Sequence, residues 1–169
     1  MREVEYRAWK YTDTPEMFYD IQGINFVAGI VFLGYRVSSS TIRTDKELLE
    51  NLILMQYTGL KDRNNKKIYE GDILRFSEES EYIQNRDSGG GIIDYDELEG
   101  FTQYGVVSFD AGCFEYKTHK TVKGRHSEYH APLSFMNGCE IIGNVYEDTE
   151  LLKWLYQVSR WQNSKTNYM

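Results

Sequence analysis

Turn residues interrupt this chain at short intervals, and that spacing constrains the fold more than any other feature. Short segments rich in Val, Ile, Phe and Tyr are separated by clusters of Gly, Asn and Asp along most of the sequence. Such segments are typical of β-strands. Strands do not alternate regularly with helical patterns, which argues against a layered parallel sheet. The sequence therefore predicts an all-β or mostly β protein, and a small closed β-barrel with two short helices fits best.

Most of the expected strands can be placed from alternation and turn chemistry. Residues 3–8 alternate polar and apolar, which puts Val4, Tyr6 and Ala8 on one face, with Trp9 at the strand end. Asn64-Asn65 predicts a tight turn, because Asn tolerates positive φ. Residues 110–112 predict a hairpin turn, and Gly143 predicts a bulge. Further strands are expected at residues 17–21, 26–37, 73–76, 104–109, 113–116 and 139–146.

Two helices are expected. Thr44 is followed by Glu47 and then by an apolar run, which is a capping-box pattern and predicts a short helix ending near Met55. Asp148 can cap a closing helix over residues 149–159, with Leu151, Leu152, Leu155 and Val158 directed inward.

The negative charge of the chain is concentrated in one segment. Ser77 to Gly100 carries eight acids against Arg86 alone, which accounts for the whole net charge of −7. The segment also contains Gly89-Gly90-Gly91 and many polar residues. It predicts a solvated, mobile loop inserted between two ordered parts. Basic residues collect just beyond it, and the two segments could neutralise each other.

These boundaries predict one domain over residues 1–160, with the acidic insertion at 77–100 and a polar tail at 161–169. The N-terminus lacks the apolar stretch of a secretory signal, and the longest uncharged run, residues 24–35, is shorter than the roughly 20 residues that cross a bilayer. Two Cys residues are too few for a disulfide scaffold. A cytoplasmic protein without a membrane partner is expected.

The segment Leu54–Phe76 is the most informative in the chain, and it closely resembles the YopX family of phage and prophage proteins. Its two halves are Gln56-Tyr57-Thr58-Gly59-Leu60-Lys61-Asp62 and Ile68-Tyr69-Glu70-Gly71-Asp72-Ile73. Flanking pieces agree with the family in the same order: Arg7-Ala8-Trp9, Gly105-Val106-Val107, Gly112-Cys113-Phe114 and residues 142–152. Four ordered blocks make a specific signal, whereas residues 10–53 and 77–103 match little.

The resemblance implies a YopX-like β-barrel, a phage or prophage origin and the cytosol of a bacterial host. It implies no activity, because the family is a domain of unknown function, and no catalytic or binding residues carry over. Two positions depart from the family pattern. Asn65 stands where Gly is usual in the turn, and Thr149 stands where Pro is often found. Both are conservative for the backbone.

Metal binding and catalysis find little support in the sequence. The soft ligands Cys113, His119, His126, His130 and Cys139 fall within one stretch, but they lack a close Cys pair of the structural zinc type. The carboxylates of residues 94–99 lie in the expected loop, where geometry is not fixed. The sequence contains no nucleophile-elbow, Walker or dinucleotide-binding motif. We therefore expect no metal, no cofactor and no enzymatic activity.

The leading hypothesis is a non-enzymatic interaction module that self-associates and contacts a phage or host macromolecule. The hypothesis rests on the Tyr-rich composition and on the absence of a recognisable set of catalytic residues in the sequence. The alternative is a small barrel that binds nucleic acid through a basic patch and stacking aromatic side chains. The negative net charge of the chain opposes this alternative. An enzyme of unknown class ranks third. The residues proposed for contact with a partner or nucleic acid are Tyr116, Lys117, Lys120, Lys123, Arg125 and Tyr129.

Overall fold

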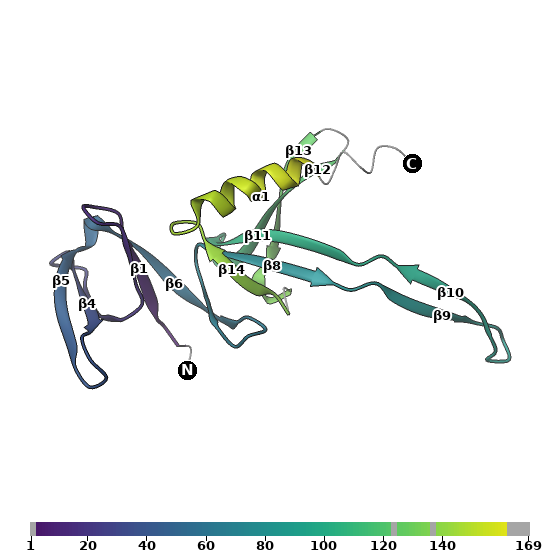
Figure 1. The fold of residues 1–169 in the computed structure, drawn as a ribbon, viewed down its shortest axis with the longest axis horizontal. Helices are drawn as coiled ribbons and strands as arrows, with labels where there is room; N and C mark the ends of the chain where they lie inside the picture. The colour runs from purple at the N-terminus through teal and green to yellow at the C-terminus, as the bar shows by residue number, and fades with distance from the viewer. Residues whose placement is uncertain (1–2, 123–124, 136–137, 162–169) are drawn as a thin grey trace.

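The C-terminal half of the chain is built on one antiparallel five-stranded sheet. The computed structural model describes residues 3–122, 125–135 and 138–161. The strand order is β13-β12-β11-β8-β14, and the single helix α1 lies along this sheet (Figure 1). The Trp154 ring of α1 meets Tyr104 edge-on at 5.4 Å. The bounds are β8 (Asp72–Glu78), β11 (Phe101–Asp110), β12 (Cys113–Val122), β13 (Arg125–Pro132), β14 (Glu140–Asn144), α1 (Thr149–Trp161) and a 3₁₀ turn, Leu133–Phe135.

The N-terminal half forms two smaller antiparallel sheets. The first has the order β2-β1-β6-β7 and the second β3-β4-β5. Their bounds are β1 (Tyr6–Lys10), β2 (Glu16–Phe18), β3 (Ile21–Asn25), β4 (Ile30–Arg36), β5 (Ile42–Leu48), β6 (Leu52–Lys61) and β7 (Lys67–Tyr69), with a 3₁₀ turn at Leu49–Asn51. The protein is mostly β, as the sequence predicts.

Three clusters of buried side chains fill the interior. The first lies under the five-stranded sheet and contains Ile68, Leu74, Val107, Tyr116, Leu133 and Cys139. The second joins β1 and β2 to β4 and contains Ala8, Phe18, Val31, Leu33 and Leu52. The third contains Met17, Met55, Tyr57 and Tyr69, with Trp9 and Tyr146 packed against it. Trp9, the penultimate residue of β1, is therefore partly buried near the strand end.

The barrel and the two helices expected from the sequence need correction. The linear order of the five-stranded sheet leaves β13 and β14 as edges, so the described strands form an open, curled sheet. The described residues contain one α-helix. Among them, no helix has both the length and the apolar character needed to cross a bilayer.

The segment that contains the capping-box pattern is not a helix. It forms strand β5, a 3₁₀ turn and the start of strand β6. Residues 42–48 form β5, which pairs with β4 from Ile30–Leu48 to Arg36–Ile42, and β6 starts at Leu52. The Glu47 carboxylate accepts bonds from Asn51 Nδ2 at 2.8 Å and Leu48 N at 3.0 Å. Pairing with β4 extends along the whole of β5, and it outweighs the local preference for a capped helix.

The acidic segment is a β-hairpin and not an irregular loop. Two strands, β9 (Glu81–Arg86) and β10 (Ile92–Leu98), pair with each other and form a separate two-stranded sheet. In Figure 1 this hairpin, here called the arm (residues 81–98), continues the β8–β11 ribbon away from the rest of the molecule. All its strand residues except Asn85 are exposed. The segment is exposed, and it forms paired strands where the sequence argument expected an irregular loop.

Several predictions based on turn chemistry are confirmed. Asn65 has a φ of 63°, as the tight turn requires. Between β11 and β12, Ala111 and Gly112 have φ values of 47° and 85°, and a two-residue hairpin turn of type I′ needs positive φ at both. The register of β14 against β8 shifts between Ile141 and Gly143, so the bulge is present.

Candidate functional site

The six residues proposed for partner contact belong to one hairpin, β12–β13, but the described side chains do not form one patch. Tyr116 is 1% exposed and lies in the core, so its ring is not accessible to a base. Tyr129 is 42% exposed. Lys117 pairs with His130, and Tyr129 pairs with Thr118. Because neighbouring positions on a strand point to opposite faces, Lys117 and Tyr129 lie on opposite faces of the hairpin. The side chains of Lys120, Lys123 and Arg125 lie outside the described residues.

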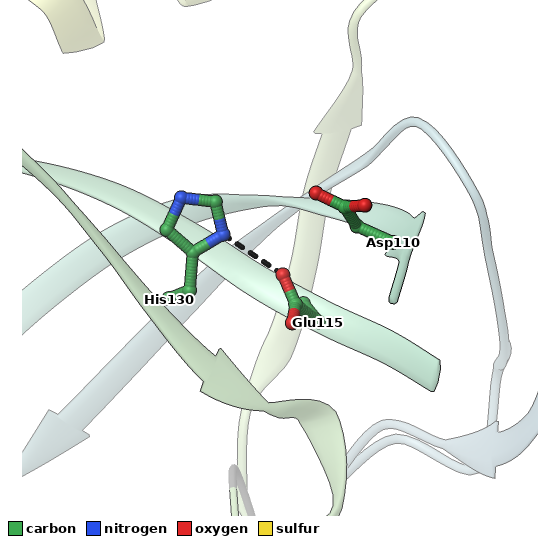
Figure 2. A group of neighbouring side chains, drawn as sticks. All are labelled: Asp110, Glu115 and His130. Atoms are coloured by element: carbon green, nitrogen blue, oxygen red, sulfur yellow. Dashed lines mark hydrogen bonds and ion pairs between the residues drawn. The ribbon is translucent and has the colours of Figure 1, made fainter. Parts of the chain in front are cut away.

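The soft ligands suggested by the sequence are dispersed where they are described. Cys113 is exposed beside the β11–β12 turn, whereas Cys139 is buried in the core and its burial raises the pKa of the thiol. The side chains of His119 and His126 lie outside the described residues. His130 instead lies beside Asp110 and Glu115, which the sequence argument did not consider (Figure 2). Pairing of β11 and β13 with β12 brings them together, and spacing along the chain gives no signal for it.

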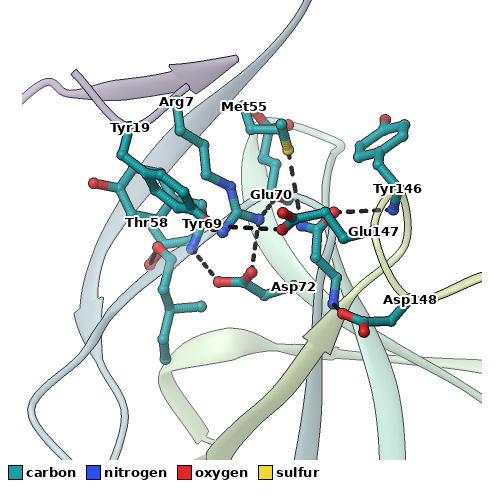
Figure 3. Close-up of polar contacts among 12 residues, drawn as sticks. Arg7, Tyr19, Met55, Thr58, Tyr69, Glu70, Asp72, Tyr146, Glu147 and Asp148 are labelled. Carbon is teal, nitrogen blue, oxygen red and sulfur yellow. Dashed lines mark hydrogen bonds and ion pairs between the residues drawn. The ribbon is translucent and has the colours of Figure 1, made fainter. Parts of the chain in front are cut away.

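The Glu-Gly-Asp part of the Leu54–Phe76 motif surrounds a buried ion pair. Arg7 Nη2 of β1 lies 2.6 Å from Asp72 Oδ1 of β8 and donates to the Glu70 carbonyl at 3.0 Å. Tyr69 N donates to Asp72 Oδ2 at 2.8 Å, and the Arg7 guanidinium lies 4.9 Å from the centre of the Tyr69 ring (Figure 3). Burial raises the pKa of Asp72, while Arg7 acts to lower it. These contacts join β1 to the start of β8 and hold the backbone between β7 and β8, so the role of the group is structural.

The Thr-Gly-Leu-Lys-Asp part of the motif holds the turn between β6 and β7. Asp62 accepts bonds from Asn64 N at 2.8 Å, Lys66 N at 2.9 Å and Ile141 N at 3.2 Å. These backbone bonds lower the pKa of Asp62 against the opposing effect of its burial. The bond to Ile141 ties this turn to β14. The motif that identifies the family therefore stabilises the junction between the two halves.

Neither the triple glycine nor a hollow beside the end of β5 provides catalytic geometry. Asp87 Oδ1 accepts bonds from the amides of Gly89 and Gly91, both at 2.8 Å, so these amides are already occupied within the arm's turn. A hollow of about 430 Å³ is lined by Ala28, Gly29, Leu48, Leu49 and Glu50. Glu50 is its one ionisable lining residue, so an acid–base pair does not converge there.

The arm is the surface with the strongest signs of an interaction role. It exposes large apolar side chains along both strands, with exposures of 65% for Tyr82, 48% for Ile83, 68% for Ile93, 52% for Tyr95 and 53% for Leu98. The outer edges of β9 and β10 carry no third strand in the described part of the chain. Unpaired strand edges are templates for contact with another chain. Sequence reasoning found the acidic charge of this segment but not the ordered strands.

Comparison with solved structures supports the fold. The crystal structure of protein EF1440 from Enterococcus faecalis matches with a TM-score of 0.53 and 20% sequence identity. The match covers 90% of this chain and 99% of that chain. At this identity the similarity concerns the fold alone. The search of curated proteins returned no match. The family model described as YopX protein matches residues 5–153, which is most of the sequence. This chain therefore belongs to the YopX protein family.

Proposed function

We propose that this protein is a non-enzymatic interaction module whose arm contacts a macromolecular partner. The observation that carries the proposal is the arm itself, an isolated hairpin with apolar side chains exposed on both strands. A two-stranded hairpin is marginally stable by itself in water. Contact with a partner would bury the apolar side chains and pair the free edges, and both effects stabilise the arm.

The charge of the arm defines the chemistry of the partner. The arm carries a net charge of −4, and with its flanking residues the segment 77–100 carries −7, so a surface with basic and apolar side chains is the expected complement. A second copy of this chain can supply basic side chains, because Lys117, Lys120, Lys123 and Arg125 follow one another closely in the sequence. Self-association through arm and basic hairpin is the first form of the proposal to test. A phage or host protein of similar surface chemistry is the second.

The setting of this function follows from the family. A phage or prophage origin and action in the bacterial cytosol are proposed on the resemblance described above. The proposal needs no cofactor and no enzymatic step. The shape of the described surface supports it, because the carboxylates of β10 face solvent along an exposed strand and do not converge in a cleft.

Removing the arm tests the proposal directly. Glu78 and Phe101 are paired residues of β8 and β11, so an Asn-Gly turn can replace residues 79–100 and close the ribbon. We expect the full chain to sediment as an oligomer, or to capture a specific protein from phage-induced cells. We expect the shortened chain to remain folded and to do neither. Equal sedimentation and equal capture by both chains would exclude the arm as the contact surface.

Two further variants separate apolar from electrostatic contact. Ile83→Ser combined with Ile93→Ser removes apolar area without changing charge, and we expect weaker association at every salt concentration. Asp94→Asn combined with Asp96→Asn removes charge, and we expect weaker association mainly at low salt, where surface charges are least screened. Val27→Ser is the matched control, because Val27 is a fully exposed apolar residue between β3 and β4, away from the arm.

The alternative function is nucleic-acid binding by the β12–β13 hairpin. The exposed ring of Tyr129 favours it, because an accessible aromatic ring can stack on a base. A gel-shift series at about 50 and 200 mM salt tests this function, because neutralisation of phosphates makes such binding strongly salt-dependent. A salt-sensitive shift that Tyr129→Ala weakens would support the alternative. Absence of a shift at the lower salt concentration would exclude it.

A further inference from the structure

We propose that Asp110, Glu115 and His130 form a binding site for a divalent transition-metal ion of the zinc class. The three residues come from three consecutive strands: Asp110 ends β11, Glu115 lies in β12 and His130 in β13. Glu115 pairs with Ser108, two residues before Asp110, and His130 pairs with Lys117, two residues after Glu115. All three ligands therefore lie on one face of the sheet, opposite the face that buries Val107 and Tyr116.

The distances within the group suit a small cation. One ligand atom from each residue lies within 4.8 Å of the others, and His130 Nδ1 is 2.8 Å from Glu115 Oε2 (Figure 2). Ligand atoms around zinc, each about 2.0–2.2 Å from the ion, lie roughly 3.3 Å apart. His130 Nδ1 and Glu115 Oε2 would have to separate by about 0.5 Å, and Asp110, whose side chain is 60% exposed and can change rotamer, would move inward.

Glu128 lies beside the other ring nitrogen of His130. His130 Nε2 lies 3.2 Å from Glu128 Oε1, on the side of the ring away from Glu115. A neutral imidazole has a single N–H. The hydrogen bond of the ring runs between Nδ1 and Glu115 Oε2 at 2.8 Å, so a metal ion at Nδ1 requires the tautomer with its proton on Nε2, beside Glu128. Carboxylate, imidazole and metal in this order form a common arrangement, in which the outer carboxylate fixes the tautomer and the ring orientation.

Two neighbouring groups fit the same interpretation. The buried Ser108 Oγ has no hydrogen-bond partner among the described residues, and Ser108 pairs with Glu115 on the ligand face. Lys117 Nζ lies 3.6 Å from Asp110 Oδ2 and holds that carboxylate near the group. An incoming divalent ion would displace this flexible, partly exposed ammonium. Lys117 is therefore a competitor that weakens the site without blocking it.

The ligand set selects the class of ion. One imidazole and two carboxylates suit zinc or a related transition metal, whereas calcium and magnesium prefer oxygen ligands alone. Three protein ligands leave a fourth position for water or for a group from another molecule. A bound ion would connect the β11–β12 turn to the edge strand β13. The inference is independent of the arm, because none of its residues lies in the segment 81–98.

Zinc titration of the chelator-stripped full chain tests the proposal. We expect one zinc ion per chain, and we expect calcium and magnesium at millimolar concentration not to compete. His130→Ala and the isosteric Glu115→Gln should each lower the zinc affinity at least about tenfold. Thermal unfolding of each variant without metal checks that it folds, and zinc should raise the melting temperature of the wild type but not of these variants.

Matched controls distinguish this group from the other soft ligands of the chain. His119→Ala combined with His126→Ala, and separately Cys139→Ala, should bind zinc as the wild type does, because Cys139 is buried in the core. Lys117→Met should strengthen binding, because it removes the competing cation. Loss of binding in either control, unchanged affinity in both His130→Ala and Glu115→Gln, or absence of zinc binding by the wild type would overturn the proposal.

Discussion

The guanidinium of Arg7 and the carboxylate of Asp72 meet at 2.6 Å with almost no access to solvent, since their side chains are 6% and 1% exposed. Arg7 belongs to β1 in the N-terminal sheet, and Asp72 opens β8 in the five-stranded sheet. The pair therefore links the two halves of the molecule through residues far apart in the sequence. Asp72 also accepts the Tyr69 amide, so it fixes the chain where β7 turns into β8.

Breaking this pair should destabilise the protein strongly. Removing one partner of a buried ion pair leaves the other charge without compensation, which costs about 3–5 kcal/mol. We expect Arg7→Met and Asp72→Asn each to lower the free energy of unfolding by that amount in urea titrations. Lys153→Met is the control, because the exposed pair of Lys153 with Glu150 should contribute less than about 0.5 kcal/mol. Equal losses in the buried and exposed variants would contradict this interpretation.

The hydroxyl of Tyr116 should be dispensable for stability. Its ring is buried in the core, and its oxygen has no hydrogen-bond partner among the described residues. Burial raises the pKa of this phenol, so it stays neutral. We expect Tyr116→Phe to leave the free energy of unfolding unchanged or to raise it by up to about 1 kcal/mol, because an unsatisfied polar atom is removed. Tyr116→Ala should lower it by about 3–5 kcal/mol through loss of packing. Thermal and urea unfolding compare the two, and a clear loss in Tyr116→Phe would reveal a bonded hydroxyl.

Gly105 should not accept a side chain. A Cβ at this position would lie 2.5 Å from the Lys117 carbonyl oxygen and 2.6 Å from the Tyr116 ring. We expect Gly105→Ala to lower the free energy of unfolding by about 1–3 kcal/mol, as overpacking does. Gly23→Ala is the matched control in a strand, because its nearest neighbour atom would be 3.5 Å away, an ordinary contact. A similar result for both variants would contradict the close approach at Gly105.

Acid should weaken the contacts of Glu47 within a defined range of pH. The hydrogen bond from Lys10 is the largest effect on this carboxyl, and with the bond from Asn51 it lowers the pKa of Glu47 from 4.5 to about 2. Because the pKa is lower in the folded state, the stabilisation is complete above about pH 4.5 and disappears as the pH falls to about 2. Unfolding followed across this range should show a smaller loss in Glu47→Gln than in the wild type.

Lys10→Met provides the check on that assignment. It removes the main cause of the lowered pKa, so its stability should also vary less between pH 4.5 and 2. Glu5, Asp62 and Glu140 have lowered pKa values as well and will leave a residual slope in both variants. A slope equal to that of the wild type in both variants would show that Glu47 makes no contribution.

Features that depend on a few neighbouring residues were predictable from the sequence. The turns at Asn65 and at Ala111-Gly112 and the bulge at Gly143 follow from local backbone preferences, which a sequence displays directly. The closing helix begins at Thr149, as the cap at Asp148 suggested. The family followed from the ordered blocks around the Leu54–Phe76 motif, and the family model confirms it.

Features that depend on pairing between distant strands were not predictable. The Thr44–Glu47 pattern resembles a helix start until β4 is alongside, and the polar segment 77–100 resembles a loop until its two ends are held by β8 and β11. The basic residues looked like one patch, yet a one-residue difference in register puts Lys117 and Tyr129 on opposite faces. The group of Asp110, Glu115 and His130 exists only because β12 is paired on both sides.

The sequence by itself determined the mostly β class, the turn positions, the family and the location of the negative charge. These properties reside in composition, in short-range conformational preference and in blocks of consecutive residues. Only the tertiary structure decided the open sheet, the Arg7–Asp72 link, the ordered arm and the grouping around His130. Each of these depends on which strand lies beside which and in what register, and hydrogen bonding and burial between distant segments set that choice.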